Sequence, residues 1–176
     1  PTSYIPTYGV SQTRAVDAAS VANVSSLIDS TQGTIYFEGK ALSLTTPGYS
    51  YFMTLSDGTG NNRLELRQTA INVQFLWRIG GVYQNQIVSS GVTITDNFKI
   101  ALKYSSSEIS FYLNGSEIGS LPSPTLYSAN TLNRFGFDDG AGSNKLQGKT
   151  KEVIYFPTAL SDLDLAILTG ATTYNT

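Results

Sequence analysis

Residues 152–170 have the sequence EVIYFPTALSDLDLAILTG, which predicts a strand, a stop at a proline and one short helix. Ser161 is a favoured helix-capping residue, and two aspartates follow in the first turn, where the helix dipole favours negative charge. Gly170 suits the left-handed conformation that ends many helices. We therefore expect a helix over residues 161–169. The side chains expected to pack it on the rest of the domain are Leu163, Ile167 and Leu168.

Short segments with β-strand patterning make up most of the remaining chain. In residues 33–41, apolar or small residues alternate with Tyr36, Glu38 and Lys40, which is the period of a strand. Turn signals such as Asn114-Gly115 separate the segments. About ten short strands with frequent turns favour a single β-sandwich or barrel domain over residues 1–176. The predicted strands are residues 13–18, 33–41, 49–55, 63–68, 71–79, 82–88, 98–104, 109–113, 132–137 and 149–156.

Composition excludes several functional classes. Charged residues make up 14% of the 176 residues and the formal net charge is −2, which does not fit a nucleic-acid binder. The chain has no cysteine and no histidine, so thiolate chemistry and histidine-based catalysis are excluded. No segment approaches the roughly 18 apolar residues of a membrane span, so we expect no membrane insertion. Because the sequence begins at Pro1 without a methionine, we expect a fragment of a longer protein.

Three stretches together resemble the concanavalin A-like, laminin G-like jelly roll. Residues 97–115 contain a strand followed by FYLNG, residues 132–137 resemble the penultimate strand of the family, and residues 152–170 resemble its closing strand and helix. The resemblance implies an all-β fold, an antiparallel jelly-roll β-sandwich with one short C-terminal helix. It also implies a module that binds glycans or surfaces.

The lead-in resembles a different set of proteins more specifically. Residues 2–7, TSYIPT, and residues 13–17, TRAVD, are similar to segments of bacteriophage tail-fibre and virion structural proteins. That resemblance implies a virion-surface or extracellular location, with a host-surface or extracellular polysaccharide as the partner. It also implies a homo-oligomer, which would be a trimer on a fibre.

Catalysis is not expected. Glucanases that share this fold resemble one another in a strand with alternating acidic residues, which sets two carboxylates on one face. Here the glutamates stand alone on their segments, and Asp138 and Asp139 are adjacent, so on a strand they would face opposite sides. Jelly-roll polysaccharide lyases use a histidine and tyrosine pair, and this chain lacks histidine. We therefore predict that the domain is not an enzyme.

Exposed aromatic rings beside amides and charges are typical of sugar-binding surfaces. Tyr36, Glu38 and Lys40 share the polar phase of one strand, and Gln74 and Arg78 share that of another. If these strands are neighbours, they line one polar sheet face, although an ordinary solvated face gives the same pattern. One aromatic candidate falls on the apolar phase of its strand, which favours a core position for it. The glycan-binding candidates are Tyr36, Glu38, Lys40, Gln74, Arg78, Trp77 and Tyr83, of which Trp77 is the apolar-phase residue.

Two loops carry the hard oxygen ligands that calcium prefers. They contain Asp57 and the pair Asp138 and Asp139, each among glycines and asparagines. Laminin G-like domains can hold a calcium ion at the rim of the sandwich. The resemblance therefore implies that these aspartates could be calcium ligands. Tight turns use the same residue types, so a structural role remains the alternative.

Three functions are therefore open. The first is a non-catalytic recognition domain of a phage fibre or virion protein that binds a host-surface glycan. The second is a purely structural domain that mediates protein–protein assembly at a fibre end or on a virion. The third is a carbohydrate-binding module of a secreted bacterial enzyme.

Overall fold

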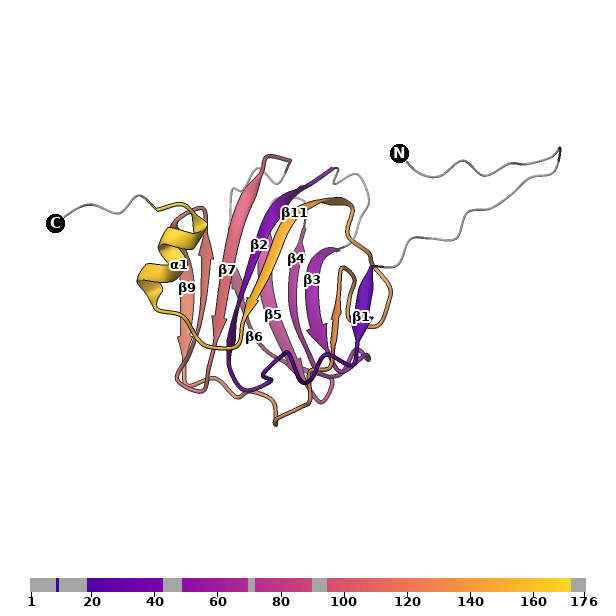
Figure 1. Ribbon diagram of the computed structural model, residues 1–176, viewed down its shortest axis with the longest axis horizontal. Helices are drawn as coiled ribbons and strands as arrows, with labels where there is room; N and C mark the ends of the chain where they lie inside the picture. The colour runs from indigo at the N-terminus through magenta and orange to yellow at the C-terminus, as the bar shows by residue number, and fades with distance from the viewer. Residues whose placement is uncertain (1–8, 10–18, 43–48, 70–71, 90–94, 172–176) are drawn as a thin grey trace.

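The computed structural model describes residues 9, 19–42, 49–69, 72–89 and 95–171. The lead-in resemblance and the strand expected at residues 13–18 lie outside these ranges. Within them, two antiparallel sheets of six and five strands pack face to face, which confirms the predicted jelly-roll β-sandwich (Figure 1). No helix in the described ranges has the length and apolar character needed to cross a membrane.

Strand order defines the two sheets. The six-stranded sheet runs β1 (Ser20–Ala22), β10 (Arg134–Gly136), β3 (Ser50–Ser56), β4 (Arg63–Gln68), β5 (Val73–Ile79) and β6 (Val82–Val88). The five-stranded sheet runs β11 (Gly148–Phe156), β2 (Gly33–Ala41), β7 (Phe98–Tyr104), β8 (Glu108–Leu113) and β9 (Ser116–Pro122).

The core lies between the two sheets and is rich in aromatic side chains. Phe37, Phe52 and Phe98 are fully buried, with ring centroids 4.9–5.9 Å apart. These rings come from β2, β3 and β7, so they join the two sheets. Side chains alternate between the two faces of a strand, so one face of each sheet packs in this core and the other face points away from it.

The hairpin between β8 and β9 confirms the turn predicted at Asn114-Gly115. Both residues have positive φ, 48° and 86°, as a two-residue hairpin requires. The sequence pattern did not predict β9, whose Gly119, Ser120 and Pro122 are poor strand formers. The hairpin brings this segment alongside β8, and pairing with β8 then overrides its weak propensity.

The C-terminal helix α1 (Asp162–Thr169) has both predicted caps. The Ser161 side chain accepts a hydrogen bond from the Asp164 amide, and Gly170 has φ 114°. The helix lies on the outer face of the five-stranded sheet beside β7 and β9 (Figure 1).

The packing face predicted for the helix is wrong for two of its three residues. Leu163 and Ile167 are 67% and 42% exposed, whereas Leu165 is fully buried against Ala101 and Tyr112. Leu168 is only partly buried at the edge of this contact. Apolar residues occur on several sides of this short helix, so spacing alone could not select the buried side.

Candidate functional site

The outer face of the six-stranded sheet carries a grid of polar side chains. On β4, Leu64 and Leu66 point into the core, so Arg63, Glu65 and Arg67 point outward. Cross-strand pairing extends each of these residues into a row. The rows are Arg134, Ser56, Arg63, Arg78 and Tyr83; Gly136, Thr54, Glu65, Leu76 and Gln86; and Tyr51, Arg67, Gln74 and Val88.

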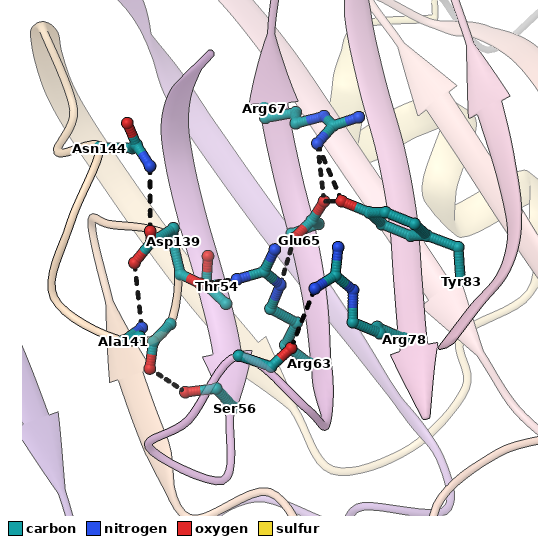
Figure 2. Close-up of polar contacts among 12 residues, drawn as sticks. Thr54, Ser56, Arg63, Glu65, Arg67, Arg78, Tyr83, Asp139, Ala141 and Asn144 are labelled. Atoms are coloured by element: carbon teal, nitrogen blue, oxygen red, sulfur yellow. Dashed lines mark hydrogen bonds and ion pairs between the residues drawn. The ribbon is translucent and has the colours of Figure 1, made fainter. Parts of the chain in front are cut away.

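Glu65 is the centre of this grid and is fully buried. Its Oε2 lies 2.5 Å from Arg63 Nε, and its Oε1 lies 3.1 Å from Arg67 Nη1. The Tyr83 hydroxyl lies 3.3 Å from the same Oε1 and donates to it. Figure 2 shows three guanidinium groups gathered around Glu65 and the Tyr83 hydroxyl directed at its carboxylate. One carboxylate therefore holds side chains from two strands, β4 and β6.

Tyrosine rings support two of the arginines from the side. Arg67 Cζ lies 3.7 Å from the centroid of the Tyr49 ring, and Arg78 Cζ lies 3.9 Å from that of Tyr83. Both rings remain nearly half exposed. Guanidinium groups stack well on aromatic faces, and the stacking fixes the plane in which their N–H groups point. The arginines are thus held in place before any ligand arrives.

Positive charge exceeds negative charge on this face. Arg134 forms a two-pronged ion pair with Asp138, with Nη1–Oδ1 and Nη2–Oδ2 distances of 2.8 and 2.5 Å. Of the remaining three arginines, Arg63 and Arg67 share Glu65, and Arg78 has no ion pair among the described residues. This leaves a surplus of two positive charges in a chain whose net charge is −2.

Arg78 is the arginine in the cluster with the weakest partners. Among the described residues it has no ion pair, its Nη1 donates to the Gly60 carbonyl at 3.3 Å, and its buried Nε has no hydrogen-bond partner. It also sits directly opposite Arg63 in the sheet, where like charges repel each other. An incoming anion would relieve both deficits.

The surroundings of Arg63 and Arg67 raise the pKa of both guanidinium groups. Burial lowers the pKa of Arg63, but the Glu65 charge together with contributions from Tyr51 and Tyr83 outweighs burial, so that pKa lies above its ordinary value. The pKa of Arg67 is raised in the same way, with hydrogen bonding to Tyr51 and the Glu65 charge opposing burial. Burial raises the pKa of Glu65 itself, against the pull of the surrounding guanidinium groups. The site therefore presents fixed positive charge at physiological pH.

A hollow of about 250 Å³ adjoins the cluster. Arg67 and Tyr83 form one side, and Leu76 lies against its floor as a buried apolar side chain. Three consecutive amide-bearing residues of β6 complete the lining: Gln84, Asn85 and Gln86.

Some predicted glycan-binding residues meet in this region. Gln74, Arg78 and Tyr83 all lie on the outer face, and the Gln74 Oε1 accepts a hydrogen bond of 3.1 Å from Arg67 Nε. The sequence analysis did not select Arg63, Glu65, Arg67 or Tyr49. The usable signal was the alternation RLELR at residues 63–67, which places three charges on one face.

Other predicted residues lie elsewhere, which corrects the expectation of a single polar face. Tyr36, Glu38 and Lys40 belong to β2 of the five-stranded sheet, so they face the opposite side of the sandwich. There the Tyr36 hydroxyl donates to Glu38 at 3.0 Å, and Lys151 pairs with Glu38 at 2.7 Å. The sequence correctly predicted which side chains point outward on each of the two strands. Alternation along a strand does not, however, determine which strands belong to the same sheet.

Trp77 is also not part of the outer face. It is 3% exposed, stacks on Phe75 in the core and donates from its indole nitrogen to the Thr125 carbonyl at 3.1 Å. The apolar-phase interpretation of this residue therefore holds, and its core position corrects the prediction that Trp77 binds glycan.

The aspartates proposed for calcium are engaged by their own loops. Asp138 is paired with Arg134, and Asp139 accepts hydrogen bonds from two backbone amides and from Asn144. Asp57 likewise accepts from Thr59 and Asn62. In the described part of the chain, no group of three acidic side chains is placed to hold a metal ion. The structure thus lends calcium no support, and calcium stays a prediction.

Solved structures with this fold include sugar-binding modules. The CBM40 of the Ruminococcus gnavus IT-sialidase superposes with a TM-score of 0.71 at 17% identity, over 89% of this chain and 95% of that one. The same module has been solved bound to alpha2,3 sialyllactose, with a TM-score of 0.71 at 18% identity over the same shares. A leech intramolecular trans-sialidase superposes at 0.69 and 19% identity, over 90% of this chain and 27% of that one. These identities are low, so the likenesses show the fold.

Sequence comparison gives the family. A search of curated proteins found no significant match. The family model described as the concanavalin A-like lectin/glucanases superfamily matches residues 13–166, which is most of the chain. The chain therefore belongs to the concanavalin A-like lectin/glucanases superfamily.

Proposed function

We propose that this domain is a non-catalytic carbohydrate-binding module that binds an acidic sugar on the outer face of its six-stranded sheet. The observation that carries the proposal is the arginine cluster, in which the buried Arg63 and Arg67 share the single carboxylate of Glu65 and the neighbouring Arg78 has no ion pair among the described residues. Leaving guanidinium groups without matched counter-charges in a low-dielectric site is costly, and a ligand carboxylate would offset that cost. Arginine forks match the planar geometry of a carboxylate.

Arg78 and Arg67 are the residues assigned to the sugar carboxylate. Arg78 has no ion pair among the described residues, and Arg67 borders the hollow of about 250 Å³. The exposed parts of the Tyr49 and Tyr83 rings offer flat apolar surface for the sugar ring beside these charges. The solved relative with bound sialyllactose, an acidic sugar joined to lactose, supports this choice of ligand class.

The surface does not support hydrolysis of the sugar. Within strands β3 to β6, Glu65 is the single carboxylate, whereas glycoside hydrolysis uses a pair on either side of the scissile bond. Glu65 is also fully buried beneath the arginines, so it positions them and does not reach the ligand. A binding role fits the arrangement better than a chemical one.

The setting of the module is a separate matter. The solved structures above belong to sialidases, which favours the secreted-enzyme alternative over a phage fibre. The virion location, the trimer and the structural assembly role stay predictions, because the lead-in on which the viral resemblance rests lies outside the described residues. An extracellular location suits either setting.

Isothermal titration calorimetry with 3′-sialyllactose and lactose tests the proposal. We expect the wild type to bind 3′-sialyllactose and to bind lactose at least about tenfold more weakly, since a charged hydrogen bond contributes about 1.5–3 kcal/mol. Arg78→Ala should weaken sialyllactose binding by a similar factor. The matched control, Lys151→Ala on the opposite face, should leave it unchanged. Equal binding of both sugars, or no effect of Arg78→Ala, would refute the acidic-sugar assignment.

A further inference from the structure

The hollow beside Arg67 has a chemistry different from that of the arginine cluster. Apart from Arg67, its lining is uncharged and consists of Leu76, Tyr83 and three amide-bearing residues of β6. Amides donate and accept hydrogen bonds without a preference for charge, which suits the hydroxyl groups of a neutral sugar. The buried Leu76 side chain provides an apolar patch at the floor between them.

A β-bulge gathers these amides. Pairing between β5 and β6 runs from Trp77↔Asn85 to Arg78↔Tyr83, so Gln84 is an extra residue on β6. Bulges re-aim side chains and increase the local twist, and they are frequent beside binding sites. Here three amide-bearing residues follow Tyr83 in succession and line the hollow, and Gln86 lies directly opposite Leu76 in the sheet.

The amides retain free hydrogen-bonding groups. Within the described residues, the Gln86 side chain has no hydrogen bond, whereas Gln84 uses only its Nε2, to the Val82 carbonyl. Asn85 uses only its Oδ1, which accepts from the Gln86 amide. Each side chain therefore still has a donor or an acceptor available to a ligand, and each is exposed to solvent.

We propose that this hollow is a second subsite, for a neutral sugar residue linked to the acidic one. The inference rests on the proposed function, because Arg67 and Tyr83 border both the arginine cluster and the hollow. A glycan whose carboxylate meets Arg78 and Arg67 would extend its next residue over Leu76 toward Gln86. The domain then recognises an acidic sugar together with its neutral neighbour.

Calorimetry with two ligands separates the subsites. The probes are the methyl α-glycoside of N-acetylneuraminic acid, which fills only the acidic subsite, and 3′-sialyllactose, which fills both. We expect the wild type to bind 3′-sialyllactose about three- to tenfold more tightly, the worth of one or two neutral hydrogen bonds. Gln86→Ala and Asn85→Ala should remove this advantage and leave binding of the glycoside unchanged. Gln32→Ala, an exposed glutamine before β2, is the matched control and should alter neither affinity.

The outcomes distinguish the two proposals. Equal wild-type affinity for both probes, unchanged by Gln86→Ala and Asn85→Ala, overturns the second subsite and leaves the acidic-sugar function standing. An equal loss for both probes in Gln86→Ala also overturns it, because Gln86 would then belong to the acidic subsite. Failure of the wild type to bind either probe overturns the proposed function itself.

Discussion

The outer faces of the two sheets differ in how their charged side chains are paired and exposed. On the five-stranded sheet, Lys103 meets both Glu108 and Asp162, at 2.7 and 2.6 Å, and Lys151 meets Glu38. Within the described ranges, Lys40, Lys99 and Lys149 of this sheet form no ion pair, and none of the three is buried, so water can solvate them. On the six-stranded sheet, Arg67 is only 6% exposed and shares a single carboxylate with its neighbours. A surplus charge is ordinary in water but costly when buried, which is why we propose the binding site on the six-stranded sheet.

Removing a carboxylate from each face should give the largest effect, with a much greater loss of stability for Glu65 on the six-stranded sheet than for Glu38 on the five-stranded sheet. Glu65→Gln leaves buried guanidinium groups without a counter-charge and should lower the free energy of unfolding by about 3–5 kcal/mol. Glu38→Gln on the opposite face should cost clearly less, because its partner Lys151 is 70% exposed and screened by water. Urea denaturation at pH 7 measures both. Equal losses would contradict the contrast between the faces.

On the same six-stranded sheet, Arg134 differs from the arginines around Glu65 because it has a carboxylate partner of its own, Asp138. Burial alone would raise the pKa of Asp138, but hydrogen bonds from Arg134 and the Gly140 amide outweigh it, and the pKa lies below its ordinary value. Asp138→Asn should lower the free energy of unfolding at pH 7 by about 1.5–3 kcal/mol.

The pH dependence of that loss has a defined sign. Because the folded pKa of Asp138 is depressed, its stabilisation is present above the unfolded carboxyl pKa of about 4 and fades as the pH falls through the folded value. Wild type and Asp138→Asn should therefore converge in stability on acidification. Denaturation curves at a series of pH values check this, and a difference that stays constant down to acidic pH would contradict the pairing.

A substitution at the core residue Trp77 should change the stability of the domain without changing its affinity for sugar. Trp77→Phe removes the indole hydrogen bond to the Thr125 carbonyl and part of the contact with Phe75, so unfolding should become easier by roughly 1–2 kcal/mol. Affinity for 3′-sialyllactose should not change, because the ring lies in the core. A loss of affinity without a loss of stability would place Trp77 in the binding surface after all.

Local signals in the sequence predicted the fold well and the site only in part. The caps of α1 and the Asn114-Gly115 hairpin depend on neighbouring residues, so the sequence pattern was sufficient for them. Whether Tyr36 and Arg78 share a sheet depends on pairing between distant strands, which period-two alternation does not encode. The role of Glu65 was hidden for the same reason, because its partner Tyr83 lies two strands away.

The helix that covers part of the five-stranded face gives the smallest expected effect. Ser161→Ala removes the capping hydrogen bond to the Asp164 amide and should cost about 1 kcal/mol of stability. The matched control is Leu163→Ser on the exposed side of the helix, which should stay within about 0.5 kcal/mol of the wild type. Both variants should bind sialyllactose normally, since α1 and the arginine cluster lie on opposite sides of the sandwich. Weakened binding in either variant, at temperatures where the protein is folded, would mean that the two faces are coupled and do not act independently.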